Sequence, residues 1–552
     1  MQLRQVKIIK YKNFENIIID FKESNFPNVF SIASKNGGGK STLLQFIFIL
    51  LHCLMEEHKK QYIQNLLKTF SKITKDIDLV KFIIEHDKQL YHLDFSIIKS
   101  KSEDMNFNLY LDIKDTKRKI NKYQDNINEF REVLELKQEL EETNRITPVM
   151  ERKIRFLRKY ISTRQEENLL RKVDRSDDIE EYKKLVNLII SKNFLSENTL
   201  NELEEICNNV QSKLDNLEEK LKESNLKYIT HLQEYKNVLL LKTKMSNELL
   251  NVLSNKIFLT APNSQIFLFL SDDEKHNIFS EFSNEKDNYN NRHYYNNTSY
   301  YYSVERAKGL LSGFFTYDFA STELILKSFK KASEDDLKKK RKTGNYGSKY
   351  DELTDELKDF LDGKEISENE DGNKVIFKSK SKRQELVPLV PEDLSHGELK
   401  KLGIYIWLKY IVEENSIVLM DEVDIALHPK WQYELIKDLV TWSKDSQFLL
   451  ATHSPQILSA TYYKNLIKLE SGEVKRFDKP PLDRDINAII TQIMEAPDFP
   501  EDLKELHKKY RKCINDGNVE TPQAKKLKEE ILEYESENSS FFQEINFDLE
   551  LI

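Results

Sequence analysis

The stretch that decides the fold is SIASKNGGGKSTLLQF, from Ser31 to Phe46. It matches the phosphate-binding loop G-x-x-x-x-G-K-[ST], except that Ser34 stands where the pattern opens with glycine. The apolar NVFSIAS just before the loop predicts a buried strand, and the run STLLQFIFILLHCLMEEHKK from Ser41, which contains no helix breaker, predicts a helix. A glycine-rich loop between a strand and a helix is the context in which this pattern binds phosphate.

Serine at the first position of the loop is predicted to be a tolerated variant. The opening glycine of such a loop mainly allows a tight turn, whereas the later backbone N–H groups, Lys40 and Ser41 would hold the phosphates. Serine is small, and the following GGG run gives the backbone freedom to complete the turn.

Composition favours a large intracellular protein. The chain has 552 residues, of which 39% are hydrophobic, so it can form three or four domain-sized units. Three cysteines, far apart in sequence, predict neither a disulfide framework nor a zinc site. The N-terminal MQLRQVKIIKYKNF has no signal-peptide core, and no apolar run is long enough to span a bilayer, so we expect a cytoplasmic location and no membrane partner.

Charge gives no global nucleic-acid signal, because the net charge is −8 and both signs are interspersed. Two local runs are basic, LKKKRKTGNYGSK from Leu337 to Lys349 and KSKSKR from Lys378 to Arg383. A solvated mobile loop and a DNA-facing patch both remain open for each run.

The pattern divides the chain into five segments. The first and fourth predict the halves of one α/β domain, the second a helical insertion, the third variable strands and polar loops, and the last a helical tail. Their bounds are 1–100, 101–255, 256–383, 384–477 and 478–552. Within the first we expect two strands around a turn near Asn13 to Asn16 and further strands over Leu79 to Lys99.

The insertion carries two heptad series. Their apolar positions are Ile120, Tyr123, Ile127, Phe130 and Leu134, then Leu200, Leu203, Cys207, Val210, Leu214, Leu217 and Leu221. They predict either an antiparallel coiled-coil arm or the amphipathic helices of a bundle. In the third segment we expect a peripheral loop at the Tyr/Asn-rich tract Asn288 to Tyr302, whose aromatic rings could alternatively stack on unpaired bases, and a polar linker over Asp335 to Lys382.

Three further motifs follow in the fourth segment. LSHGE, Leu394 to Glu398, opens a helical run, so it predicts an N-terminus whose serine and backbone N–H groups face an anion or simply cap the helix. SIVLMDEVDIALHP predicts a buried strand that ends in Asp421 and Glu422, at the edge where α/β sheets bind ligands. QFLLATHSP predicts a neighbouring strand that ends beside His453.

Together these motifs resemble the ATP-binding-cassette class of ATPases, and the turn at Asn13-Phe14, the helical insertion and the DE…LHP run resemble its RecF, SMC and OLD-type branch. The resemblance covers about Met1 to Lys99 and Gln384 to Phe477. It implies an α/β P-loop ATPase head, a mixed sheet flanked by helices, with a partly coiled-coil insertion. It also implies ATP and Mg²⁺ as cofactors.

The resemblance assigns roles to individual residues. The loop residues Asn36, Gly37, Gly38, Gly39 and Thr42 would bind the phosphates, Lys40 would reach the β- and γ-phosphates, and Ser41 and Asp421 would hold Mg²⁺. Glu422 would be the general base and His453 the γ-phosphate switch. Ser395 and Gly397 would contact nucleotide on the opposite subunit of a head-to-head homodimer, with Asp424 in its dimer-facing loop. Gln89 and Gln265 are both candidates for the glutamine of the Q-loop.

What the ATPase would drive is suggested by the rest of the chain. After the predicted hairpin LIKLESGEVKRFDK we find neither the Toprim pattern of OLD-type nucleases nor an HNH histidine cluster, so we expect no nuclease centre. The DINAII tail and the Tyr/Asn-rich middle are similar to PtuA, the ATPase family of Septu anti-phage systems and some retrons. That resemblance implies a separate HNH nuclease of the PtuB kind, DNA, and a retron reverse transcriptase with its msDNA as partners.

Two other classes are compatible with the same motifs. A RecF-like or SMC-like repair ATPase would embrace DNA without a nuclease partner, and salt-sensitive DNA binding would support it. A transporter cassette is disfavoured by the long helical insertion and by the lack of a membrane-coupling segment. The C-terminal helices would either dock the partner or simply complete the core.

Overall fold

The structure is a computed structural model. It describes residues 1–552 except 22–26, 36, 74, 100–104, 143–146, 148–178, 193–196, 224, 233–236, 263–264, 266–268, 271–274, 276–305, 318–319, 361–363, 370–373, 381–385, 390–393, 444, 471, 478, 481–484, 498, 518–520 and 552. The Tyr/Asn-rich tract Asn288 to Tyr302 lies outside the described residues. No helix in the described part of the chain is both long and apolar enough to cross a membrane.

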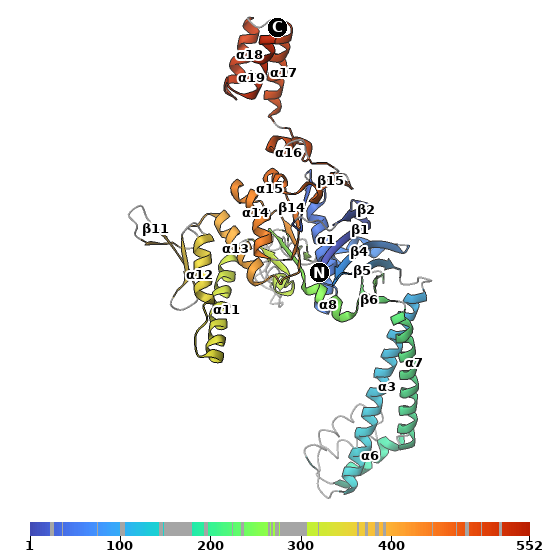
Figure 1. The fold of residues 1–552 in the computed structure, drawn as a ribbon. Helices are drawn as coiled ribbons and strands as arrows, with labels where there is room; N and C mark the ends of the chain where they lie inside the picture. Colours follow the sequence, from blue (N-terminus) through green and yellow to red (C-terminus); the bar gives the residue numbers. More distant parts are fainter. Residues whose placement is uncertain are drawn as a thin grey trace, which may run out of the picture.

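A mainly parallel seven-stranded sheet forms the centre of the molecule, as expected for an α/β head (Figure 1). In spatial order its strands are β16 (Glu473–Arg476), β15 (Leu466–Glu470), β3 (Val29–Ser34), β14 (Gln447–Ala451), β13 (Ile417–Asp421), β8 (Ile257–Ala261) and β9 (Phe314–Thr316). Only β16 is antiparallel to its neighbour, so β15 and β16 make the predicted hairpin. Strands β3, β13 and β14 are buried along their whole length, which explains their continuous apolar sequence.

A second sheet of six antiparallel strands lies beside the first. Its order is β2 (Phe14–Asp20), β1 (Gln2–Tyr11), β4 (Ile77–His86), β5 (Gln89–Ile98), β7 (Val238–Lys242) and β6 (Leu226–His231). The strands expected around Asn13 and over Leu79 to Lys99 are therefore present. Helix α1 (Lys40–His52) shares one core with both sheets, and α13 (His396–Tyr410) and α14 (Pro429–Trp442) share a core with the opposite face of the seven-stranded sheet.

Helix α1 is shorter than the sequence predicts. The breaker-free run was expected to stay helical to Lys60, but α1 ends at His52. The Ser254 hydroxyl donates to the Leu51 carbonyl at 2.9 Å, so a residue 203 positions away binds the last turn. The chain then continues through η1 (Glu57–Lys59), α2 (Lys60–Leu66) and η2 (Lys68–Lys72). Helix α8 (Asn247–Asn255), which carries Ser254, thus sets this end of α1.

The helical insertion forms an arm that projects from the six-stranded sheet (Figure 1). Helices α3 (Met105–Glu142) and α7 (Glu197–Glu223) pack side by side, and the core of their contact includes Ile120, Ile127, Cys207 and Leu214, members of both heptad series. Beyond this contact the buried positions of α3 shift to Val133, Leu136 and Leu140, and α6 (Ile179–Lys192) packs against α3. Phe130 and Leu134, the last positions of the first series, are therefore only half-buried.

The predicted polar linker over Asp335 to Lys382 is wrong. That region contains the end of α11 (Ala320–Thr343), then α12 (Lys349–Phe360), β10 (Glu365–Glu368) and β11 (Val375–Lys380), and β11 pairs with β12 (Leu386–Leu389). Apolar residues spaced among many charges, including Phe329, Leu353, Leu357 and Phe377, meet in one core with α13. These residues contact one another only after the helices and strands pack together. In the sequence they are separated by many charged residues, so no apolar pattern indicated a core.

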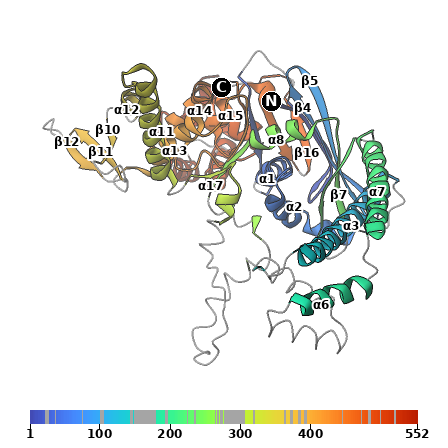
Figure 2. The ribbon, with the colours of Figure 1, turned by 90° about the horizontal axis from the view of Figure 1, so that it is seen from below.

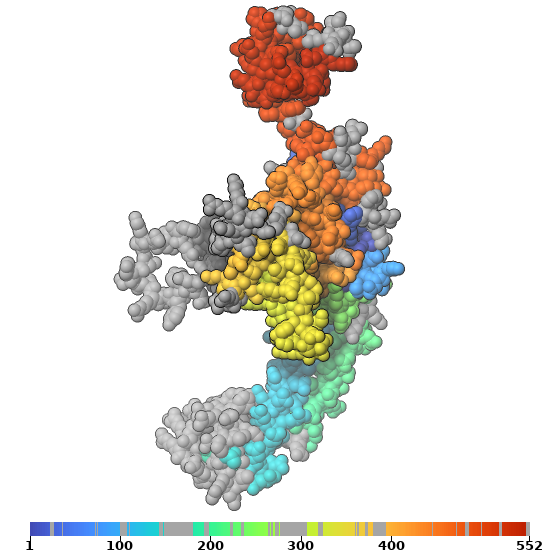
Figure 3. Space-filling model, turned by 60° about the vertical axis from the view of Figure 1, so that its left-hand side comes forward, coloured from blue at the N-terminus to red at the C-terminus, as the bar shows by residue number. Residues whose placement is uncertain are grey.

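The C-terminal tail consists of helices, as expected. After α15 (Pro455–Ala460), η6 (Tyr463–Asn465) and α16 (Ile486–Gln492), the chain forms α17 (Glu501–Asn515), α18 (Pro522–Leu532) and α19 (Ser540–Leu551). These last three helices have a core of their own and stand off from the head (Figures 1 and 3). They do not complete the core of the head, which was one of the two alternatives.

Candidate active site

The glycine loop connects β3 to α1 and closes tightly on itself. The Gly38 N–H donates to the Lys35 carbonyl at 3.0 Å, and Gly37 and Gly39 have φ values of 78° and 92°. A Cβ atom at Gly38 would lie 2.5 Å from the Ser34 side chain, and one at Gly39 would lie 2.5 Å from the Phe14 ring. Only glycine fits these positions without movement of neighbours. Asn36 lies outside the described residues.

Ser34 is accommodated as the last residue of β3. It is buried, and its φ is not in the left-handed region. Its hydroxyl donates to the Lys35 carbonyl at 2.7 Å and accepts from the Lys40 ammonium at 2.9 Å. Ser34 therefore needs no backbone freedom that only glycine has, and its side chain also positions Lys40.

Lys40 and His453 meet at the carboxyl edge of the seven-stranded sheet. The Lys40 Nζ lies 2.7 Å from the His453 Nε2, although the two residues are 413 positions apart. Burial lowers the pKa of Lys40, while Asp421, Asp424 and Glu422 oppose that shift. Partial burial and the charge of Lys40 lower the pKa of His453, and the Nε2 of the neutral ring can accept a hydrogen bond from the Lys40 ammonium.

Asp421 ends β13 and is 1% exposed. Its carboxylate is hydrogen-bonded to Ser41, the first residue after Lys40, and accepts from the Gln265 amide at 2.5 Å. Its other oxygen, Oδ1, is buried and has no hydrogen-bond partner in the described structure. Burial raises the pKa of Asp421, since the charged form has lost water and gained too few partners.

The structure separates the two candidate Q-loop glutamines. Gln265 is buried beside Asp421, and its Oε1 accepts from the Gln45 amide on α1 at 2.8 Å. Gln89 lies at the exposed start of β5, where it accepts from the Tyr91 hydroxyl. Only Gln265 belongs to this group of side chains.

Glu422 follows Asp421 in a left-handed conformation, with φ of 51°. This region is costly for a residue other than glycine, and such strain often marks a functional site. Lys400 of α13 holds the turn by donating to the carbonyls of Glu422 and Ile425 at 3.1 and 2.7 Å. Burial raises the pKa of Glu422, and the nearby Asp421 and Asp424 raise it further.

The remaining predicted residues lie either near Lys40 and His453 or at the start of α13. Near His453, Asp424 accepts from the Thr452 hydroxyl at 2.7 Å. Thr42 is half-buried in the first turn of α1, close to Lys40 in sequence. Ser395 caps α13 in a reciprocal capping box with Glu398. Gly397 is buried where a Cβ atom would lie 2.5 Å from the Ala426 carbonyl oxygen. No hydrogen bond in the described residues joins Ser395 to Lys40, Asp421 or Glu422.

Three supporting residues were missed from the sequence. Besides Gln45 and Lys400, the hydroxyl of Tyr317 donates to the Asp421 carbonyl at 3.1 Å, and the Lys400 ammonium lies 4.0 Å from the Tyr317 ring centre. The available signal was a polar residue inside an apolar helix, namely glutamine in LLQFIF and lysine in LKKLGI. Tyr317 carries no such signal because its role depends on contacts between distant segments.

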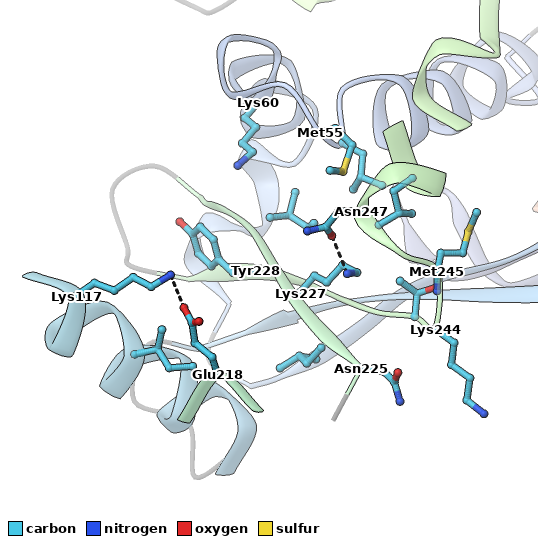
Figure 4. Close-up of a pocket in the computed structure, with 16 residues that line it drawn as sticks. Met55, Lys60, Lys117, Glu218, Asn225, Lys227, Tyr228, Lys244, Met245 and Asn247 are labelled. Carbon is cyan, nitrogen blue, oxygen red and sulfur yellow. Dashed lines mark hydrogen bonds and ion pairs between the residues drawn. The ribbon is translucent and has the colours of Figure 1, made fainter. Parts of the chain in front are cut away.

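A cavity of about 640 Å³ lies away from these motifs, where the arm joins the head (Figure 4). Lys117 and Glu218 of the arm form an ion pair at 2.6 Å on one side, and Lys227 donates to Asn247 at 2.8 Å on the other. Met55 and Lys60, just past the end of α1, complete this wall. None of the motif residues lines this cavity.

One family model of an AAA domain matches part of the chain. The family model described as "AAA domain, putative AbiEii toxin, Type IV TA system" matches residues 270–459, about a third of the chain. This region contains Ser395, Asp421, Glu422 and His453 but not the glycine loop.

Two similar curated proteins are described as probable ATPases of retrons. The Retron Vc95 probable ATPase of Vibrio cholerae serotype O1 biovar El Tor is 32% identical over 122 residues, which is 20% of this chain and 23% of that protein. The Retron Ec83 probable ATPase of Escherichia coli is 28% identical over 118 residues, 21% of this chain and 22% of that protein. The chain thus matches less than a quarter of the length of these relatives.

Solved structures of Smc head domains also align with this chain. One, from Pyrococcus furiosus, has an extended coiled coil and is bound to the C-terminal domain of ScpA. It is 12% identical, with 86% of this chain and 95% of that chain covered and a TM-score of 0.29. Another, from Pyrococcus yayanosii, has a coiled coil and joint. It is 12% identical, with 89% and 98% covered and a TM-score of 0.31. These TM-scores are too low to carry an argument about function.

Proposed function

We propose that this chain binds and hydrolyses ATP, with Mg²⁺, at the edge of the seven-stranded sheet. The observation that carries the proposal is the meeting of Lys40, Ser41, Asp421 and His453, which come from three motifs far apart in sequence. The match to an AAA domain model supports the same activity.

The residues present fit a nucleotide and a hard cation. Glycine is required at Gly38 and Gly39, where a Cβ atom would clash with Ser34 and Phe14, and such a tight glycine-rich turn ahead of a helix presents backbone N–H groups to phosphate. The unpartnered Asp421 Oδ1 and the hydroxyl of Ser41, which contacts the same carboxyl group, are oxygen ligands of the kind that Mg²⁺ prefers. When bound, Mg²⁺ would neutralise phosphate charge. Lys40 would contact the phosphates, and Glu422, whose raised pKa favours proton uptake, would act as the general base on water.

We further propose that two heads dimerise around ATP. Ser395 is exposed at the N-terminus of α13 and, among the described residues, makes no hydrogen bond to Lys40, Asp421 or Glu422. It is therefore accessible to a nucleotide held by a second copy. The close approach of Gly397 to the Ala426 carbonyl would fix the LSHGE turn beside the loop that carries Asp424.

The proposed role of the ATPase is to regulate a separate HNH nuclease of the PtuB kind, acting on DNA, within an anti-phage complex like Septu. The retron ATPases among the similar proteins support a link to retrons, which extends the proposal to a reverse transcriptase and its msDNA. The three C-terminal helices, with a core separate from the head, are the proposed docking module for the nuclease.

The test is to purify the chain and its Glu422→Gln variant with the products of neighbouring genes and to measure ATP turnover and DNA cleavage. Removal of the general base should lower ATP turnover at least about a hundredfold while ATP still binds. Cleavage should require the nuclease partner.

Glu473→Gln is the matched control, because Glu473 is exposed on β16 at the sheet edge. It should keep wild-type turnover. Equal turnover in Glu422→Gln would exclude the proposed base, and DNA cleavage by this chain alone would exclude the separate nuclease.

A further inference from the structure

The turn between α11 and α12 concentrates positive charge in a protein whose net charge is negative. Residues 337–349 contain six basic side chains and no acidic one. Five of the six are consecutive, Lys338 to Lys342, and occupy the end of α11, while the sixth is Lys349 at the start of α12. We call residues 338–349 the basic tip.

Most of this charge has no acidic partner. Asp335 pairs with Lys338 at 3.3 Å and with Lys349 at 2.9 Å. Within the described residues, no ion pair is formed by Lys339, Arg341 or Lys342, and all three are exposed. One or two cations are enough to complement the negative end of a helix dipole, so the remaining charge needs another explanation.

An exposed aromatic ring and a hollow accompany the charge. Tyr346 is 62% exposed, and the Lys340 ammonium lies 3.8 Å from its ring centre. A cleft of about 460 Å³ runs between the end of α11 and the start of α12, and it is lined by lysines, among them Lys339 and Lys342, and by three carboxylates. Positive charge beside an exposed aromatic ring is the combination that binds unpaired bases and their phosphates.

The basic tip is connected to the candidate active site through α13, because α11 and α12 pack against this helix. Asp336 accepts from the backbone N–H groups of Lys349 and Tyr350, both at 2.9 Å, which fixes the turn. Phe329 of α11 and Leu357 of α12 share a core with α13, the helix whose Lys400 holds the Glu422 turn. Figure 1 shows the α11–α12 pair extending from the head on this support.

We propose that the basic tip binds single-stranded nucleic acid, with Lys339, Arg341 and Lys342 on phosphates and Tyr346 stacked on a base. This site would be where the nucleic acid of the proposed function contacts the chain. The proposal rests on the proposed function only in assuming that the protein meets nucleic acid.

The test measures binding of a fluorescent 20-nucleotide single strand and of the matching duplex to the full chain over a range of salt concentrations. For Lys339→Ala/Arg341→Ala/Lys342→Ala, we expect about tenfold weaker binding and a salt slope smaller by about 2, because each lost phosphate contact removes about 0.7. For Tyr346→Ala, we expect single-strand binding to weaken about tenfold and duplex binding to change little.

The matched control is Lys509→Ala/Lys512→Ala/Lys526→Ala, which removes three exposed charges from the C-terminal helices. It should keep wild-type affinity and slope. The inference would be overturned if the wild type does not bind the single strand or if the tip variant binds it equally well. It would also be overturned if polyglutamate displaces the labelled strand as well as an unlabelled single strand does. ATP turnover of the tip variant, measured without nucleic acid, should stay at the wild-type level, so failure of the inference is distinct from failure of the proposed ATPase.

Discussion

At the scale of a residue, His52 shows how a buried titratable group holds the C-terminal end of α1 in place. Its Nδ1–H donates to the Ser254 carbonyl at 2.9 Å, and its Nε2 faces the Gly313 N–H and the Lys59 ammonium, both at 3.4 Å. Protonation of Nε2 would place its hydrogen against these two donor groups, so the charged ring is disfavoured. Burial, and then the charge of Lys59, lower the pKa of His52 to about 4.

This shift predicts acid sensitivity. The unfolded chain takes up the proton near pH 6.5, whereas the folded chain resists it until about pH 4, so stability is lost as the pH falls through this window. The loss attributable to His52 is about 3 kcal/mol. His52→Asn retains a donor near Nδ1 and does not titrate. Urea unfolding at pH 7 and pH 4.5 should therefore show a smaller acid loss for the variant, and equal losses would contradict the assignment.

At the scale of elements, one glutamine side chain links the two sheets of the head. Gln447 lies at the start of β14, and its amide accepts from the Leu3 N–H at 2.7 Å and donates to the Leu3 carbonyl at 2.9 Å. Leu3 is on β1 of the six-stranded sheet, and both residues are fully buried. The two hydrogen bonds thus satisfy backbone groups of one sheet from a side chain of the other.

Gln447→Leu keeps the volume but leaves the Leu3 N–H and carbonyl buried without partners. We expect the free energy of unfolding to fall by roughly 2–4 kcal/mol, since each unsatisfied group costs about 1–3 kcal/mol. Gln2→Leu is the control, because Gln2 lies on the same strand but is only half-buried. It should cost less than about 1 kcal/mol. If urea unfolding gives the same loss of free energy for both variants, the two hydrogen bonds between Gln447 and Leu3 do not stabilise the protein.

The elements also show what could be predicted from sequence. Strands β3, β13 and β14 were predictable because strands buried on both faces are continuously apolar, and the heptads of α3 and α7 predicted their contact. The end of α1 depends on Ser254, and the choice of Gln265 over Gln89 depends on contact with Asp421. Such contacts join segments more than 150 residues apart, and no local pattern encodes them. The core of α11 and α12 was hidden for a different reason, because its apolar residues are spaced among many charges and meet only when these helices pack against α13.

At the scale of the whole molecule, the chain separates into a head, an arm and a C-terminal bundle of α17, α18 and α19. Figure 2 shows the arm helices α3 and α7 at the side of the six-stranded sheet, away from α11 and α12. The bundle is centred on aromatic contacts, with Phe542 5.5 Å from Phe541 and 6.0 Å from Tyr510 between ring centres. A core that is not shared with the head implies that the bundle unfolds separately.

This independence predicts two thermal transitions, which can be shifted one at a time. Phe542→Ala should destabilise the bundle by about 3–5 kcal/mol and leave the transition of the head and ATP turnover unchanged. Phe82→Ala, in the core shared by the two sheets, should lower only the transition of the head. Calorimetry of the full chain separates these outcomes, and a shift of both transitions by Phe542→Ala would show that bundle and head are one cooperative unit. If the bundle docks the nuclease, the Phe542→Ala variant should also fail to co-purify with the nuclease. The Phe82→Ala variant should still co-purify with it at temperatures where the head of that variant is folded.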